Sequence, residues 1–241
     1  MKFRFRKKSK PPITDPSPLD SLGGLYHHYA FFGHNNYQLP GIFEKNQMCK
    51  QPVITAYIAY AIAMAKAAAE TEISFVELFC ADGFYAMTAA NLGCQKSVGI
   101  DNDRDGHLRN ATIIANTLEL SNVEFLKAEI SPDATFEKYD IVANVGGLYH
   151  VDNPEEILLK SYDMANRFLI IQNVVSLAST SEDYYESPAP GWDWGNRYSR
   201  QSFDKLVKSH FKKIVFEHFN ELTGNDGLEN RGSLYYLIEK P

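Results

Sequence analysis

The chain has 241 residues, of which 44% are hydrophobic and 22% are charged, a balance that fits one domain with appendages and excludes wholesale disorder. The formal net charge is −6, but six of the first ten residues are Lys or Arg, so 18 basic and 30 acidic residues remain in the rest. The excess of acidic residues after the first ten residues disfavours a nucleic-acid partner, unless a local basic patch compensates. The three cysteines show no CxxC spacing, which argues against a disulfide framework and favours reduced, cytoplasmic thiols.

The N-terminal part of the chain is expected to form appendages. Residues 1–20 are rich in charge, Pro and Ser and show no periodicity, which predicts a disordered basic arm. No apolar stretch follows the basic residues, as it would in a secretory signal. The most apolar run, residues 53–65, is too short for a membrane span.

Residues 21–70 are expected to be a cap segment and a helix. Residues 21–51 are irregular and aromatic-rich, so we expect them to cover a larger domain. Pro52 suits the first turn of a helix over residues 53–69, which contain strong helix formers.

The main domain is expected over residues 71–241, where short β-like runs alternate with helical ones. The predicted strands are Ser74–Phe79, Ser97–Ile100, Val123–Lys127, Ile141–Asn144, Phe168–Gln172, Lys213–Phe219 and Ser233–Glu239, with helices near 84–92, 104–119 and 154–165. Such alternation predicts a parallel sheet with helices on both faces. The last two strands lack a helix between them and must pair antiparallel. The fold class is therefore α/β: an open sheet of seven strands, five parallel and then an antiparallel closing hairpin.

Acidic residues follow the first strands at the sheet edge where ligands bind in such folds. Gly83 lies in the loop after the first strand and allows a ligand to approach the backbone. Asp101 ends the second strand, where a carboxylate can accept hydrogen bonds from two ribose hydroxyls. Glu129 follows the third strand and could accept from an exocyclic amine. These residues predict a pocket for an adenine nucleoside.

A dinucleotide dehydrogenase is the first alternative for this pocket. Ala81-x-Gly83-x-x-Ala86 is a degenerate form of the dinucleotide fingerprint, but the first glycine, which makes the turn under the pyrophosphate, is missing. Glu77 in the first strand would repel a pyrophosphate and could help to hold a cationic ligand that carries an amino acid.

With these features the chain resembles the class I S-adenosylmethionine-dependent methyltransferases over about residues 73–240. The family's first motif has an acid followed by three alternating glycines, and here Glu77 is followed at those places by Phe79, Ala81 and Gly83. The resemblance implies a Rossmann-like fold, S-adenosyl-L-methionine as cofactor, and methyltransferase activity.

The other family motifs extend the implied cofactor site. Asp101 with its neighbour Asn102 matches the position that binds the ribose, and Glu129 with the Ile130 amide matches the position that binds the adenine amine. The strand-four motif contains Asn144. The run that follows it is similar to a subgroup that includes tRNA wobble-uridine methyltransferases and bacterial enzymes of unknown function.

The methyl acceptor is expected beyond the fourth strand. Methyl transfer is an in-line displacement, so alignment and exclusion of water matter most, and a base is needed only if the acceptor must lose a proton. Tyr149 and His150 are the catalytic candidates: His150 as a base, or as a residue that orients the next helix, and Tyr149 chiefly as a pocket wall.

Two other segments are expected to contact the acceptor. The aromatic segment 176–199 is interpreted as a lid loop, in which Trp192, Trp194 and Tyr198 could stack on a planar acceptor and Arg197 could hold a carboxylate or phosphate. Alternatively, the two tryptophans only fix the loop to the core. In the N-terminal segment His34 and Tyr37 are candidates for a flap over the pocket, and the histidine spacing disfavours a metal site.

The sequence therefore predicts an S-adenosylmethionine-dependent methyltransferase of a small or medium-sized acceptor: a metabolite, a sugar or a natural-product intermediate. The alternatives are a tRNA-modifying methyltransferase, which the acidic body disfavours, and a non-catalytic nucleoside-binding module, which Phe79 and Ala81 in glycine places would allow. The acceptor, the acceptor atom and the oligomeric state are not specified by the sequence.

Overall fold

The computed structural model describes residues 17–68 and 71–241. Most of the predicted basic arm, residues 1–16, therefore lies outside the described residues. The structure differs from the prediction at residues 18–20, which belong to the 3-10 helix η1 (Pro18–Leu22). Ser17 caps this helix, because its hydroxyl accepts the Leu19 amide while the Asp20 carboxylate accepts the Ser17 amide.

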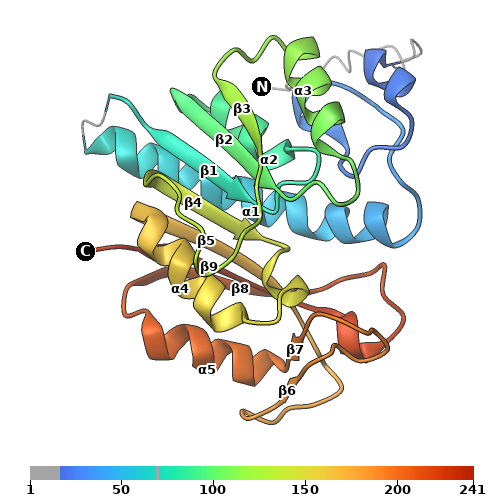
Figure 1. Ribbon diagram of the computed structural model, residues 1–241, viewed down its shortest axis with the longest axis vertical. Helices are drawn as coiled ribbons and strands as arrows, with labels where there is room; N and C mark the ends of the chain where they lie inside the picture. Colours follow the sequence, from blue (N-terminus) through green and yellow to red (C-terminus); the bar gives the residue numbers. More distant parts are fainter. Residues whose placement is uncertain (1–16, 69–70) are drawn as a thin grey trace, which may run out of the picture.

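A seven-stranded sheet forms the centre of the described chain (Figure 1), in the order β3-β2-β1-β4-β5-β9-β8. Its strands are β1 (Ser74–Leu78), β2 (Lys96–Asp101), β3 (Val123–Lys127), β4 (Tyr139–Val145), β5 (Ala165–Val175), β8 (Ile214–Glu221) and β9 (Gly232–Glu239). All seven predicted strands are present. The order reverses between β1 and β4, and a crevice for a ligand is expected at the carboxyl ends of these two strands.

The strand directions refine the predicted pattern. β3, β2, β1, β4 and β5 pair in parallel, and β9 pairs antiparallel with both β5 and β8. The closing hairpin of β8 and β9 is therefore present. However, β8 points in the same direction as the first five strands, so six strands run one way and only β9 runs against them.

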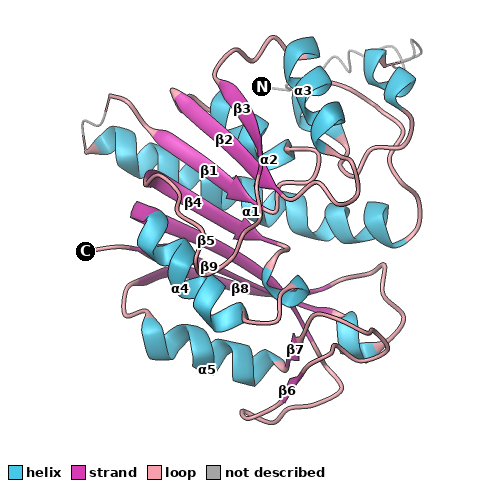
Figure 2. Ribbon diagram, viewed as in Figure 1, coloured by secondary structure: helices cyan, strands magenta, loops and turns pink. Residues whose placement is uncertain are grey.

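Helices cover both faces of this sheet (Figure 2). On one face lie α1 (Ile42–Ala67), α2 (Phe84–Asn91) and α3 (Leu108–Thr117); on the other lie α4 (Pro154–Met164) and α5 (Arg200–His210). Alternate residues of one strand separate accordingly: Phe168 and Ile170 of β5 enter the first core, whereas Leu169 and Ile171 enter the second.

Helix α1 begins earlier than predicted. The sequence assigned residues 42–51 to an irregular segment, yet they form the first ten residues of α1, and Pro52 lies inside the helix. The segment contains good helix formers. Pro52 is exposed, so the ring and the backbone carbonyl that loses its partner face solvent, where water can satisfy that carbonyl.

The region after β5 is more ordered than an open lid loop. Within residues 176–199, β6 (Tyr185–Glu186) pairs with β7 (Arg197–Tyr198), and Asn196, Arg197 and Ser199 are buried. Helix α5 follows immediately and was not predicted. Its start is fixed by Ser199, whose hydroxyl accepts the Ser202 amide.

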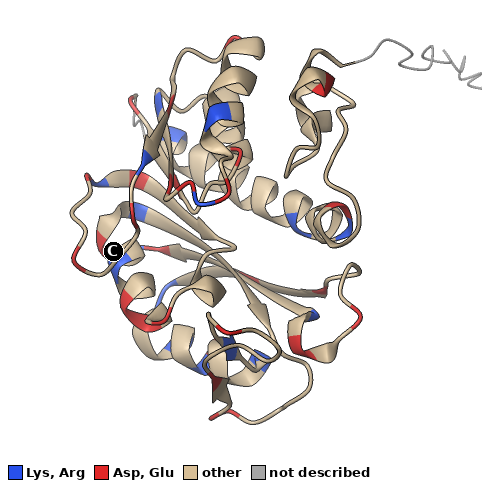
Figure 3. Ribbon diagram, turned by 45° about the vertical axis from the view of Figure 1, so that its right-hand side comes forward, with Lys and Arg blue, Asp and Glu red and all other residues tan. Residues whose placement is uncertain are grey.

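Two further observations concern a membrane and a highly charged partner. Among the described residues, no helix combines the length and the hydropathy that a membrane crossing requires. Figure 3 shows Lys and Arg residues spread among Asp and Glu residues over the described elements.

Candidate functional site

A cavity of about 570 Å³ lies at the carboxyl ends of the parallel strands, a volume in the usual range for small-ligand sites. Six of the nine residues predicted to bind a cofactor line it: Glu77, Phe79, Ala81, Asp101, Asn102 and Glu129. The structure thus brings together residues that follow three different strands.

Asp101 organises the loop after β1. One of its carboxylate oxygens accepts the Ala81 amide at 3.0 Å and the other accepts the Asp103 amide at 2.7 Å. Each oxygen keeps a second lone pair that a ligand can use. The carboxylate is therefore fixed in orientation at the wall of the cavity before any ligand binds.

The loop after β1 has the backbone of a glycine-rich loop despite its side chains. Phe79, Ala81 and Gly83 all have positive φ values, of 60°, 47° and 75°, a conformation that glycine adopts most easily. The Phe79 ring lies against Gly147, where an added Cβ would meet it. The missing glycine at residue 79 is thus accommodated by a glycine in the loop after β4.

Glu77 has a structural contact as well as a place in the cavity wall. It is 1% exposed, and its carboxylate accepts the Ala86 amide at 2.8 Å in the first turn of α2. Burial raises the pKa of Glu77 well above its usual range, although the bond from Ala86 acts in the opposite direction. The remaining carboxyl oxygen can accept a further donor from the cavity.

Asn102 and Glu129 lie together at the exposed rim of the cavity. The Asn102 side-chain amide donates to the Glu129 carboxylate at 3.2 Å. This contact joins the ends of β2 and β3 and orients both side chains at the part of the site predicted for the nucleoside.

Three predicted cofactor residues do not line the cavity. Gly83 caps α2 beneath the Phe125 ring, and Ile130 is part of the core on the α4 face. Asn144 is fully buried and donates to the Ser161 hydroxyl at 2.8 Å. In the described structure these three residues support the cavity from behind its wall.

The predicted catalytic candidates lie in the short helix η3 (Leu148–His150) and form an aromatic cluster at the cavity. The His150 ring stacks on Trp194 with centroids 4.9 Å apart, and Trp192 lies beside Trp194 at 4.8 Å. Tyr149 packs against His150 at 4.0 Å. All four side chains line the cavity, so segment 176–199 contributes its tryptophans to the same site.

His150 is held in its neutral form. Burial lowers the pKa of His150 to about 3, and nearby positive charges act in the same direction. Its Nδ1 atom is buried and has no hydrogen-bond partner among the described residues. Those positive charges belong to Arg197, Lys50 and Arg104.

The N-terminal segment contributes to the site through residues other than the predicted ones. His34 and Tyr37 do not line the cavity, and Tyr37 is 58% exposed. Instead Tyr26 and His27 line it. The Leu25 amide donates to the Tyr37 carbonyl and the Leu39 amide donates to the Leu25 carbonyl, while the half-buried His34 ring lies beside the Ser17 hydroxyl, away from the cavity lining.

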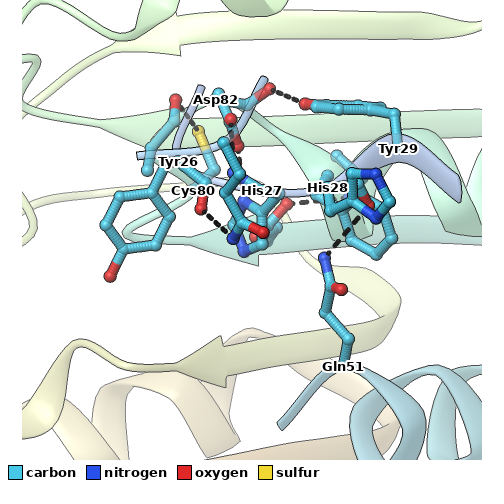
Figure 4. Close-up of polar contacts among 12 residues, drawn as sticks. Tyr26, His27, His28, Tyr29, Gln51, Cys80 and Asp82 are labelled. Atoms are coloured by element: carbon cyan, nitrogen blue, oxygen red, sulfur yellow. Dashed lines mark hydrogen bonds and ion pairs between the residues drawn. The ribbon is translucent and has the colours of Figure 1, made fainter. Parts of the chain in front are cut away.

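His27 fixes this segment to the loop after β1 (Figure 4). Its backbone amide donates to the Asp82 carboxylate at 2.9 Å, and its ring Nδ1 lies 2.5 Å from the other carboxylate oxygen. The Tyr29 hydroxyl donates to the Asp82 carbonyl at 2.9 Å. Burial acts to raise the pKa of Asp82, but the contacts with His27 outweigh it, and the pKa lies below its usual value.

Arg197 and Tyr198 are neighbours in β7 but face different places. Arg197 lines the main cavity, whereas Tyr198 lies outside it and packs on Tyr185 and Phe203. The side chains of a strand alternate between its two faces, so only one of the two could have reached the site.

Several residues of the site were not predicted from the sequence. Helix α1 supplies Asn46, Gln47 and Lys50, β5 supplies Gln172, and the loop before β9 supplies Asn230. Gln47 and Lys50 continue the buried stripe that contains Ile54. Polar residues on a buried stripe of a helix are the sequence signal that could have indicated that these two residues belong to a site.

A family model described as a methyltransferase domain matches residues 69–218. A search of curated proteins found no match. Magnesium protoporphyrin IX methyltransferase from Synechocystis, with S-adenosylhomocysteine (SAH) bound, is similar in structure at a TM-score of 0.63 and 11% identity, over 88% of this chain and 93% of that chain.

Two other solved structures are similar at a TM-score of 0.55. They are the N-terminal domain of EvdMO1 with SAH bound, at 17% identity over 77% of this chain and 81% of that chain, and coclaurine N-methyltransferase with N-methylheliamine and SAH, at 13% identity over 77% and 73%. At these identities the likeness shows the fold.

Proposed function

The chain belongs to the methyltransferase domain family, its methyl donor is S-adenosylmethionine, and we propose that it methylates a small acceptor in the cavity beyond β1 and β4. The observation that carries the proposal is the fixed Asp101 carboxylate on the wall of this cavity, with Asn102 and Glu129 beside it. The donor supplies an activated methyl group on a sulfonium, and the protein must position it and exclude water.

The residues present fit this donor. Asp101 and Asn102 would hold the ribose, and Glu129, with the Ile130 amide close to it in sequence, would hold the adenine. Glu77 and the loop from Phe79 to Gly83 would receive the amino-acid end. That loop keeps positive φ values at the three glycine places of the family motif, so its backbone can approach a ligand closely even though Phe79 and Ala81 carry side chains.

A small acceptor is supported by the cavity and by the charge pattern. The cavity is partly closed by the aromatic cluster of Tyr149, His150, Trp192 and Trp194. Basic and acidic residues are mixed over the described surface elements (Figure 3), which does not favour a long polyanion. A tRNA substrate, suggested by the sequence around Leu148, is a less favoured alternative.

Removing the Asp101 carboxylate is expected to weaken SAH binding at least tenfold. Asp101→Ala removes the acceptor for the ribose hydroxyls and also releases the Ala81 amide, and a hydrogen bond to a charged group contributes about 1.5–3 kcal/mol. Calorimetric titration with SAH measures the effect. Asp105→Ala is the matched control, because Asp105 lines the same cavity and, among the described residues, its one ion pair, with Arg104, is long at 3.9 Å.

SAH binding by the wild type that is unchanged by Asp101→Ala would contradict this assignment of the site. If the wild type bound neither SAH nor S-adenosylmethionine, the proposed function itself would be wrong. Tight binding of NAD would restore the dehydrogenase alternative.

His150 is expected to remain uncharged throughout the pH range 5–8. Its lowered pKa makes it a weak proton acceptor, so we propose that it orients an acceptor as a neutral hydrogen-bond partner. An NMR titration of the histidine ring protons measures this directly, with His150→Gln to assign the signal. A midpoint above about pH 5.5 would contradict the prediction and restore a role as general base.

The same shift has a consequence for stability. Unfolded His150 takes up a proton near pH 6.5, whereas the folded state resists protonation until about pH 3. Between these two pH values the unfolded state therefore binds more protons than the folded state. The contribution of His150 to the free energy of unfolding falls as the pH falls through this window.

A further inference from the structure

The charged residues of the cavity are divided between two walls. One wall carries Glu77 in β1, Asp101 at the end of β2 and Glu129 after β3, with Arg104 and Asp105 in the loop after β2, whereas the other carries Lys50 from α1 and Arg197 from β7. The acidic wall is the one proposed for the donor. The opposite wall therefore carries two cations that the donor site does not require.

Arg197 is buried without an acidic partner. It is 1% exposed, and among the described residues no carboxylate oxygen lies within 4.0 Å of it. Its Nε donates to the Asn230 side-chain oxygen at 2.7 Å and its Nη1 to the Asn196 carbonyl at 2.5 Å. These bonds use two of five N–H donors, and the burial of an arginine is costly unless it is paired.

The guanidinium of Arg197 contacts two aromatic rings. It lies 5.1 Å from the centroid of Tyr149 and 4.9 Å from that of Trp192. The two rings and the two hydrogen bonds fix its plane. Such a fixed, planar cation presents its free N–H groups in a geometry that suits a carboxylate.

Lys50 is the second cation on this wall. It is 6% exposed, and within the described part of the chain its ammonium group makes no ion pair and no hydrogen bond. Burial lowers the pKa of Lys50 to about 8, so the group stays mostly charged at neutral pH. A lysine kept charged and unpaired at a cavity wall is ready for an anion.

Lys50 and Arg197 act on the same side chain. The positive charges of both contribute to the lowered pKa of His150, which lines the cavity with them. Arg104, from the loop after β2, contributes as well. Arg197 lies over the rings of Tyr149 and Trp192, and Lys50 lines the same cavity as this aromatic cluster.

We propose that Lys50 and Arg197 hold a carboxylate of the methyl acceptor, so that the acceptor is an organic acid whose apolar body lies beside the aromatic cluster. This inference rests on the proposed function, because it places the acceptor opposite the donor. A carboxylate matches the planar Arg197 guanidinium, and the rings of Tyr149, Trp192 and Trp194 give the cavity an apolar part beside it for the rest of the molecule.

The test compares benzoate with benzamide, which have the same shape and differ in charge, by saturation-transfer NMR on the protein saturated with SAH. Benzoate is expected to bind at least tenfold more tightly than benzamide. Lys50→Met, which nearly keeps the length of the side chain, is expected to weaken the binding of benzoate about tenfold and to change the affinity for SAH less than twofold. Lys45→Met, at an exposed position of the same helix, should change neither.

Arg197→Lys tests the second cation, and its fold is checked by circular dichroism because Arg197 also joins Asn196 to Asn230. If Arg197→Lys does not fold, the benzoate affinity of Lys50→Met alone tests the proposal. Equal binding of benzoate and benzamide would overturn the proposal. So would an equal loss of SAH and benzoate affinity in Lys50→Met, which would place the donor's own carboxylate at these cations.

Inorganic phosphate serves as the competing anion. Displacement of benzoate by phosphate at lower concentration than by a second carboxylate, acetate, would overturn the carboxylate assignment in favour of a phosphate. Complete absence of SAH binding would overturn the proposed function instead, and the comparison of benzoate with benzamide on the protein without SAH would still decide whether the cations hold a carboxylate.

Discussion

Replacing His27 with alanine is expected to lower the free energy of unfolding by about 3–5 kcal/mol, because it leaves the Asp82 carboxylate buried without its ring partner. Asp82 is 0% exposed and His27 is 3% exposed, so water cannot easily replace the lost contact. The His27 ring also stacks on Phe84 with centroids 5.1 Å apart. Both contacts hold the N-terminal segment on the loop after β1.

Urea denaturation of His27→Ala, Asp82→Ala and the double variant measures this pair. We expect the double variant to be clearly less destabilised than the sum of the single ones, because it leaves neither partner buried alone. Asp183→Ala is the control, since Asp183 pairs with Lys205 at an exposed site and its removal should leave the free energy of unfolding nearly unchanged. Additive single effects would show that the two side chains are not coupled.

The direction of the Asp82 pKa shift determines how the stabilisation by this pair depends on pH. The pKa of Asp82 is lower in the folded state than its usual value near 3.9. The stabilisation by this group is therefore fully present above about pH 4 and is lost as the pH falls through the folded pKa. Asp82→Asn is expected to reduce the difference between neutral and acidic stability.

Gly83→Ala is expected to destabilise the fold by about 3 kcal/mol and to weaken SAH binding. Residue 83 has a φ of +75°, which costs a residue with a Cβ about 1–2 kcal/mol. The new Cβ would also meet Cε1 of the Phe125 ring at 2.1 Å, and such overpacking costs about 1–3 kcal/mol. Thermal unfolding and SAH titration measure the two effects.

The control for Gly83→Ala separates strain from crowding. Gly33 has a φ of +83° with no atom within 4 Å of an added Cβ, so Gly33→Ala should carry the backbone strain alone, about 1 kcal/mol. Adding Phe125→Leu to Gly83→Ala removes the ring atoms in contact and should recover part of the loss. Equal effects at residues 33 and 83 would mean that Phe125 does not restrict the loop.

The sequence was sufficient to predict the strands, because each has a short β-branched or aromatic run bounded by turn residues. It also predicted that Asp101 and Glu129 would lie at the same edge of the sheet, since the carboxyl ends of parallel strands meet there. Helix α5 was not predicted, although Ser199 is a typical N-cap residue and the buried Phe203 and Val207 are spaced four residues apart; these signals lie at and directly after the end of the aromatic segment 176–199, which has no helical period.

The contacts of the N-terminal segment could not be read from the sequence. His27 and Asp82 are 55 residues apart, and their contact depends on how the segment lies across the sheet. His34 and Tyr37 had the same composition signal as Tyr26 and His27, but composition does not say which of them faces inward. By contrast, Lys50 lies on the buried stripe of α1 and could have been found once the helix start was placed correctly.

The placement of β9 between β5 and β8 has a consequence for the order of folding. β9 is made after both of its neighbours, and it supplies the hydrogen-bonding partner to each. During synthesis on the ribosome, the edge of β5 therefore stays open until β9 emerges, although strands β1 to β4 can already pair. An unpaired, apolar edge invites association with other chains, so the nascent protein is expected to be most dependent on chaperones in the interval before its final strand is inserted.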